Sequence, residues 1–390
     1  MARLAVMEVV VAAIKSPWPF IAAGLLLEHM PVNADVLPEQ RADALYHSYS
    51  GGGVDIDGPS VLVLKHIGQN ADVSGNYYVD MVSSASIDVI STASPYSEQR
   101  TQENVSVDYL HAKSTFNLGY TNSTESDYQA NSANFGLTQN LLGDMTTVSM
   151  GYTRGWDTVE QNGEPDFSKD ITRQNYTLGL SQVITKDLLV DAAFELVTDQ
   201  GFLNNPYRSV RYLDDASGQG YSYQLERYPE TRTSNALAVN FRYYLPYRAS
   251  MNGQYRFFTD TWGITAHTAE LGYTQPFHDK WTLDLSYRYY TQGEADFYND
   301  LFPYKNAQNY LARDKELSAF HSQSFGLGLS YDFTSDHWKA INKSTLNLAY
   351  NHMLFAYQNF RDVTKGGTPG QEPLYDFSAD VVQLYLSLWF

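Results

Sequence analysis

The stretch from residue 281 to residue 290 reads WTLDLSYRYY, and large apolar or aromatic side chains occupy every second position of it. Successive side chains of a β-strand point to opposite faces, so this stretch predicts a strand with one apolar face and one polar face. The same period recurs in SFGLGLSYDF (324–333) and in VVQLYLSLWF (381–390). No long segment after residue 60 shows the 3.6-residue period of an amphipathic helix. The sequence therefore predicts an all-β protein.

Alternation of this kind occurs in soluble β-sandwiches as well as in membrane barrels, so alternation alone does not distinguish the two classes. The polar faces are rich in Gly, Ser, Thr and Asn, and the segments reach the ten or so residues that a tilted membrane strand requires. Short connections are predicted at 140–144, 185–187, 246–250 and 277–280, and long ones near 155–171, 200–231, 292–317 and 357–376. Short periplasmic turns alternate with longer extracellular loops in this way in outer-membrane β-barrels.

The final stretch carries the most specific local pattern. It alternates strictly and ends on an aromatic residue, and it resembles the terminal strand that bacterial outer-membrane proteins present to the barrel assembly machinery. We predict that this insertion signal consists of Leu384, Leu386, Leu388 and Phe390. We therefore expect a location in the outer membrane of a Gram-negative bacterium, with membrane lipid, lipopolysaccharide and the assembly machinery as partners.

Composition excludes several other classes of protein. The 390 residues include no Cys, which excludes disulfide frameworks, thiolate zinc sites and haem attached through Cys. Asp and Glu number 44 against 26 Lys and Arg, a net charge of −18, and this argues against nucleic acid as a partner because phosphate binding needs Lys and Arg. The mean hydropathy of −0.38 coexists with 14% aromatic residues. This combination is expected when lipid-facing residues alternate with polar ones.

The amino terminus has the features of an export signal. Two short apolar stretches precede Val32 and Ala34, which are small residues of the kind that a signal peptidase prefers. We predict a cleaved signal peptide at 1–34, with cleavage after Ala34, and a single outer-membrane β-barrel domain at 35–390. The alternative is an uncleaved membrane anchor, but both apolar stretches are short for a membrane-spanning helix.

Counting strands backward from the last one predicts about sixteen. The region from about residue 60 onward accommodates roughly fifteen strands, and bacterial barrels have an even number. The additional strand is expected from residues 44–56. The alternative is a barrel of fourteen strands in which the stretch before about residue 97 folds inward as a plug.

No catalytic motif stands out. The sequence contains no Gly-x-Ser-x-Gly elbow, His-Glu-x-x-His helix, phosphate loop or dinucleotide fingerprint, and its His residues are scattered. We therefore expect no enzyme, no cofactor and no metal site. Acid pairs such as Asp214 and Asp215 are more typical of solvated loops than of calcium sites, which need more oxygen ligands.

Charged residues on the predicted inner faces are the best candidates for a functional site. The inward register includes Asp191, Glu195, Arg242, Arg256, Glu270, Asp284 and Arg288. A mixture of this kind tunes the electric field of a conducting channel or closes the lumen as a salt-bridge network. The pattern leaves both interpretations open.

The segment 41–96 suggests a family. It contains RADALY (41–46), GGGV (51–54), IDGPS (56–60), SGNYYVD (74–80), SASIDV (84–89) and TASPY (92–96). These motifs resemble the uncharacterised bacterial family known as domain of unknown function 3570, and the resemblance extends over nearly the whole mature chain. It implies an outer-membrane-type barrel without an assigned activity. It also implies neighbouring flavin-transfer and thioredoxin-like proteins, and hence a periplasmic redox partner.

Three functions follow from these observations. The leading one is a porin-like channel or transporter for small polar solutes. Its rival is a non-conducting scaffold or sheath for an envelope redox, electron-transfer or cofactor-maturation complex. In that case the redox chemistry would belong to the partner, because this chain has no Cys. An outer-membrane hydrolase of the phospholipase type is the third, since it needs only a His beside Ser, Asn or Asp on adjacent strands.

Overall fold

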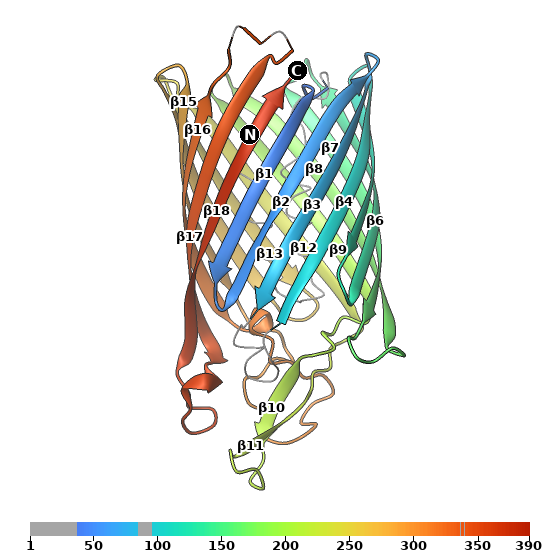
Figure 1. Cartoon of the computed structure of the whole chain (residues 1–390), viewed down its shortest axis with the longest axis vertical. Helices are drawn as coiled ribbons and strands as arrows, with labels where there is room; N and C mark the ends of the chain where they lie inside the picture. Colours follow the sequence, from blue (N-terminus) through green and yellow to red (C-terminus); the bar gives the residue numbers. More distant parts are fainter. Residues whose placement is uncertain (1–36, 85–95, 336, 339) are drawn as a thin grey trace.

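The computed structural model describes residues 37–84, 96–335, 337–338 and 340–390. In these ranges sixteen strands form one closed antiparallel barrel, and two short strands form a separate hairpin (Figure 1). The wall consists of β1 (Arg41–Gly51), β2 (Val54–Ile67), β3 (Ala71–Ser84), β4 (Tyr96–His111), β5 (Ser114–Thr124), β6 (Tyr128–Leu141), β7 (Thr146–Glu160), β8 (Ser168–Thr185), β9 (Leu188–Gly201), β12 (Thr231–Tyr244), β13 (Ser250–Asp260), β14 (Thr265–Phe277), β15 (Trp281–Gln292), β16 (Phe320–Asp332), β17 (Lys343–Arg361) and β18 (Leu374–Trp389). The hairpin consists of β10 (Ser209–Leu213) and β11 (Tyr221–Leu225).

Helical structure in the described ranges is limited to two short 3-10 turns, η1 (Lys315–Leu317) and η2 (Val363–Lys365). Neither of these helical turns has the length and apolar character needed to cross a membrane. The signal peptide predicted at 1–34 lies outside the described residues.

The barrel closes between its first and last strands. β1 pairs with β18, from Arg41 opposite Trp389 to Gly51 opposite Ala379. The prediction of about sixteen strands is therefore confirmed. The alternative of fourteen strands with an inward-folded plug is wrong, because residues 41–84 form β1, β2 and β3 of the wall. The connection from β3 to β4 lies outside the described residues.

The two ends of the barrel have different connections. One end, called the turn side, has the short connections, which include 112–113, 186–187 and 278–280. Strand β1 begins and strand β18 ends at the turn side (Figure 1). The opposite end, called the loop side, has the long connections 202–230, 293–319 and 362–373. In outer-membrane barrels the short turns face the periplasm and the long loops face the exterior.

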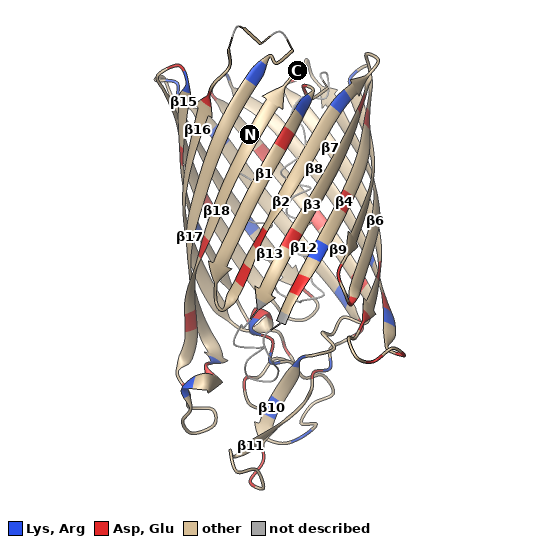
Figure 2. Cartoon of the chain, in the orientation of Figure 1, with Lys and Arg blue, Asp and Glu red and all other residues tan. Residues whose placement is uncertain are grey.

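Large apolar side chains cover the outer face of the wall. On β12, Leu237, Val239 and Phe241 are 40–50% exposed, whereas the intervening Ala236 and Ala238 are at most 4% exposed. Most of the wall carries no charge (Figure 2). A continuous apolar outer face is what a barrel in lipid requires, because the hydrocarbon layer offers no partner to a polar group.

Tyrosines form a girdle on the outer face, on the loop-side edge of the apolar rows. Each hydroxyl donates a hydrogen bond to a side chain nearer the loop side: Tyr46 to Asp57 at 2.8 Å, Tyr120 to Asn131 at 2.8 Å, Tyr176 to Gln174 at 2.9 Å, Tyr287 to Gln323 at 3.2 Å and Tyr350 to Asp380 at 2.6 Å. A tyrosine with its ring on the apolar side and its hydroxyl among polar groups is typical of a membrane interface. The wall beyond this girdle therefore extends outside the hydrocarbon layer.

Candidate functional site

All seven charged residues predicted to face the lumen occupy inner-face positions. Each lies on the strand face opposite the exposed apolar residues; Arg242, for example, lies between the outward-facing Phe241 and Tyr243. The seven are Asp191 and Glu195 on β9, Arg242 on β12, Arg256 on β13, Glu270 on β14, and Asp284 and Arg288 on β15. The alternation of side chains along each strand is what places them on one face.

The structure brings most of these charges together in pairs. An Nη2–Oε2 distance of 3.2 Å joins Arg256 and Glu195, and the Glu195 side chain is only 3% exposed. Asn175 donates a further hydrogen bond of 3.0 Å to Glu195. Glu270 lies directly opposite Arg288 in the pairing of β14 with β15. The middle of this inner wall therefore carries nearly balanced charge.

Sequence reasoning missed a second group of inner charges, nearer the loop side. Arg173 on β8 lies 3.0 Å from Asp157 and 3.9 Å from Asp199. Arg232 on β12 forms an ion pair with Asp260, and its guanidinium lies 4.7 Å from the Trp262 ring centroid. Extending the period-two pattern of β7 and β8 into the expected loop at 155–171 would have found part of this group.

The long loops fill the loop-side mouth of the barrel with an apolar core. Leu203 and Tyr228 from one loop and Phe297, Tyr298 and Leu317 from another are each at most 7% exposed. They belong to the same cluster as residues of the inner wall, namely Ile171, Phe258 and Tyr357. Trp262 lies between the two loops, with its ring centroid 5.5 Å from that of Tyr228 and 5.1 Å from that of Phe297.

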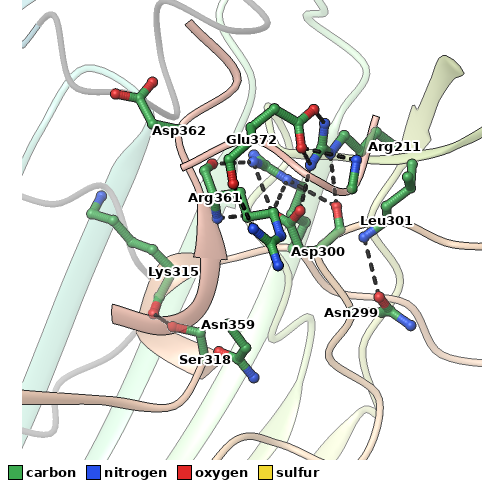
Figure 3. A network of polar contacts seen from close by, with 12 residues as sticks. Arg211, Asn299, Asp300, Leu301, Lys315, Ser318, Asn359, Arg361, Asp362 and Glu372 are labelled. Atoms are coloured by element: carbon green, nitrogen blue, oxygen red, sulfur yellow. Dashed lines mark hydrogen bonds and ion pairs between the residues drawn. The ribbon is translucent and has the colours of Figure 1, made fainter. Parts of the chain in front are cut away.

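A buried ion-pair network joins three of the long connections; we call it the latch (Figure 3). Arg211 of β10 is fully buried and donates from Nε to the backbone oxygen of Asp300 at 2.9 Å. Its two terminal nitrogens bond to the carboxylates of Asp300 and Glu372. Arg313 contacts the same Asp300 carboxylate at 3.0 Å. The latch thus links 202–230, 293–319 and 362–373.

The arginine contacts of the latch change the pKa of one of its acids, Glu372. Burial, the largest single influence, would raise the pKa of Glu372. The hydrogen bond from Arg211, backbone hydrogen bonds and the positive charge of Arg211 together outweigh burial and hold that pKa below its ordinary value. Glu372 is therefore ionised over the physiological range. Removing its arginine partner would leave a buried negative charge without compensation.

A second buried acid in the loops behaves in the opposite way. Glu226 accepts hydrogen bonds from the Arg313 amide at 2.7 Å and from the Tyr228 hydroxyl at 2.6 Å. Burial, and then the negative charge of Asp314, raise the pKa of Glu226 to about 7, against a smaller lowering by Arg208. This carboxyl group therefore titrates near neutral pH.

The turn-side part of the inner wall is exposed on β12 and β13, whereas the inner-face residues Asn140, Thr147, Asn347 and Ser387 of other strands are buried. Arg242 is exposed, and its inner-face neighbours Asn240, Asn252 and Gln254 are all partly exposed. These side chains point away from the outer surface, so the water that reaches them lies inside the barrel. A wall of sixteen strands is wide enough to enclose water.

Two further groups in the described part of the barrel each consist of ionisable side chains that lie close together. His47 on β1 contacts Asp80 at 2.8 Å and stacks on Tyr78, and the His47 and Asp80 side chains are at most 1% exposed. In the described part of the chain, Glu98, Glu125 and Asp127 form a group of carboxylates within 4.8 Å of one another. Three carboxylates supply only part of the oxygen shell that a calcium ion needs.

Comparison with known families gives one match over most of the chain. The model of a family described as "Protein of unknown function (DUF3570)" matches residues 82–177 and 156–352. No curated protein sequence matches the chain.

Solved structures with a similar shape are barrels of low sequence identity. A structure titled bacterial polysaccharide outer membrane secretin is 6% identical with a TM-score of 0.48, over 90% of this chain and 98% of that one. The CymD monoaromatic hydrocarbon channel is 8% identical with a TM-score of 0.45, over 92% and 90%. A Pseudomonas aeruginosa FadL homologue is 10% identical with a TM-score of 0.44, over 92% of both chains.

Proposed function

This chain belongs to the family described as protein of unknown function DUF3570, and we propose that this outer-membrane β-barrel is a channel for small polar solutes. The observation that carries the proposal is the wetted turn-side inner face of β12 and β13, where Arg242 is exposed and its polar neighbours are partly exposed inside a closed wall of sixteen strands. A scaffold needs no solvated interior. A channel does, because a polar solute must keep hydrogen-bonding partners along its path.

In this proposal the loop-side mouth is the constriction of the channel. The apolar core of the loops packs against the inner wall, and the latch holds three connections in one arrangement. Passage is then controlled by how far these loops move away from the wall. The tightness of the latch sets how often they do so, because buried ion pairs are costly to separate.

The direct experiment is single-channel recording from the purified protein in a planar bilayer. We expect discrete, reproducible current steps, together with swelling of liposomes that contain the protein when a small sugar or amino acid is supplied. Folding of the inserted protein is checked by its heat-dependent migration on a denaturing gel. A correctly folded protein that carries no current and admits no solute contradicts the proposal.

A second candidate is the non-conducting scaffold for an envelope redox or cofactor-maturation complex. The buried latch and the apolar core favour it, because both resist opening of the mouth. This candidate predicts a silent bilayer and capture of a periplasmic redox protein by the turn side. Release of fatty acid by the purified protein would instead favour the phospholipase-type hydrolase.

A further inference from the structure

Six inward-facing aspartates lie near the turn-side opening. Asp72 on β3 is buried against His66, and Asp332 is the last residue of β16; we call the remaining four the aspartate ring. They are Asp43 on β1, Asp108 on β4, Asp191 on β9 and Asp284 on β15, each within three residues of the turn-side end of its strand. Following the closed sheet from β1 through β15, β9 and β4, the strands that carry them are four, four, five and three steps apart. The four carboxylates are thus distributed around the whole circumference.

All four ring residues are partly exposed, and two of them have neutral hydrogen-bond donors as neighbours. Asp108 accepts a bond of 2.8 Å from Asn117, and Asp284 accepts one of 2.6 Å from Thr274. Such donors stabilise a carboxylate without cancelling its charge. The basic groups near this level include Arg41, 3.0 Å from Asp43, and His66, which contacts Asp72. They also include Arg242 on β12 beside β9, and Lys343 over the ring of Trp389.

Charge is arranged differently deeper in the lumen. There Arg173, Arg232 and Arg256 each lie beside a carboxylate of a neighbouring strand or of a strand across β12. Paired charges largely cancel at a distance, whereas a ring of like charges around an opening creates a field along its axis. Rings of Asp or Glu are a recurring device of cation channels.

We infer that the lumen prefers cations, and that the aspartate ring at the turn-side opening sets this preference. The inference rests on the proposed channel function and adds the class of solute. The ring acts through its field and holds no fixed ion. Because salt screens charge over about 10 Å at 0.1 M, the preference weakens as ionic strength rises.

The test is the reversal potential of the full chain in a bilayer with a KCl gradient. Wild type is expected to pass K⁺ in preference to Cl⁻. In the variant with Asp43→Asn, Asp108→Asn, Asp191→Asn and Asp284→Asn, we expect the permeability ratio to fall by roughly threefold or more, the effect of about one kT of potential. The single variants Asp191→Asn and Asp284→Asn give smaller shifts in the same direction and remain informative if the fourfold variant does not fold.

Matched controls come from the outer face of β2. Asp57 is contacted there by the hydroxyl of the outward-facing Tyr46, and Asp55 by the hydroxyl of Ser50. The double variant Asp55→Asn with Asp57→Asn should leave the reversal potential unchanged. A non-selective or anion-preferring wild-type current overturns the inference but keeps the channel, as does an unchanged ratio in the ring variants. A folded protein without current contradicts the channel proposal itself.

Discussion

The two halves of one lumen use charge in opposite ways. On the loop side, Arg211 is fully buried and touches two carboxylates, and the surrounding loops form an apolar core against the wall. On the turn side, Arg242 is exposed, and the aspartates of the ring are partly exposed. A buried ion pair is little screened by water, so it holds loop segments together strongly. An exposed charge is hydrated, and it acts on ions in the lumen through its electric field.

We therefore expect the loop side to control opening of the channel and the turn side to control which ions pass. Changes on the loop side should alter how often the mouth opens and how stable the loops are. Changes on the turn side should alter which ions pass and leave stability nearly untouched. The four predictions below test this division, in order of decreasing effect on loop stability.

Replacing Arg211 should have the largest effect. Arg211→Ala leaves Glu372 buried without its arginine partner and leaves Asp300 with Arg313 alone. Breaking a buried pair in this way costs about 3–5 kcal/mol. We expect the loops to detach from the mouth while the barrel remains folded. Limited proteolysis within 202–230 measures this and should accelerate strongly.

The control for this variant is Arg248→Ala on the turn side. Arg248 is 73% exposed and lies 3.9 Å from Asp279, so its pair contributes little to stability. Equal protease resistance of the Arg211 variant and wild type would show that the latch does not hold the loops.

Replacing Leu317 tests the apolar core independently of charge. Leu317 is 1% exposed between the loops and the wall. Leu317→Ala should destabilise the loop arrangement by about 2–4 kcal/mol, through lost burial and a cavity. The same proteolysis assay reports the change, and Leu142→Ala, at a turn position that is 79% exposed, is the matched control. A similar outcome for both variants would contradict a packed mouth.

The pH dependence of the loops should follow Glu226. Its pKa is raised to about 7 by burial and by Asp314, so the folded loops favour the protonated form. Stability from this group is therefore full below the ordinary pKa of a glutamate and is lost as pH rises through about 7. The expected change is of order 1–3 kcal/mol.

The measurement is the rate of loop proteolysis at pH 5.5 and pH 8, corrected for the protease's own pH profile. Wild type should be cleaved faster at pH 8. Glu226→Gln removes the titrating group and should flatten the profile. Faster cleavage at the lower pH would mean that another group controls the loops.

Replacing Arg242 should have the smallest effect on stability and a clear effect on selectivity. Arg242 is exposed in the lumen, so Arg242→Ala should change stability by less than about 0.5 kcal/mol. Removing a positive charge beside the aspartate ring should also increase the preference for K⁺ in the bilayer. An unchanged preference would place Arg242 outside the conducting path, and a decrease would contradict the expected sign.

The sequence predicted the wall better than the mouth, for a physical reason. Side-chain alternation is a local property of a strand, so WTLDLSYRYY already places Asp284 and Arg288 on the inner face. The pairing of Arg256 on β13 with Glu195 on β9 also needed the strand order and the register across β12. Register and barrel closure then position the remaining inner residues.

The latch could not be predicted in this way. Arg211 lies 89 residues from Asp300 and 161 residues from Glu372, and no periodic pattern connects the three loops. Loop positions depend on the packing of Trp262, Tyr228 and Phe297, which belong to different connections. The expectation of long loops was correct near 200–231, 292–317 and 357–376, whereas most of 155–171 belongs to β7 and β8. The inward packing of the loops required the folded structure.

The measurement that tests the central claim most directly is single-channel recording of wild type beside the Arg211→Ala variant under identical conditions. If the interior is a solute path whose mouth is held by the latch, both proteins conduct, and the variant is open for a larger fraction of the time or carries larger current steps. If both proteins are folded and silent, or if their currents are indistinguishable, the account of a latched channel is contradicted.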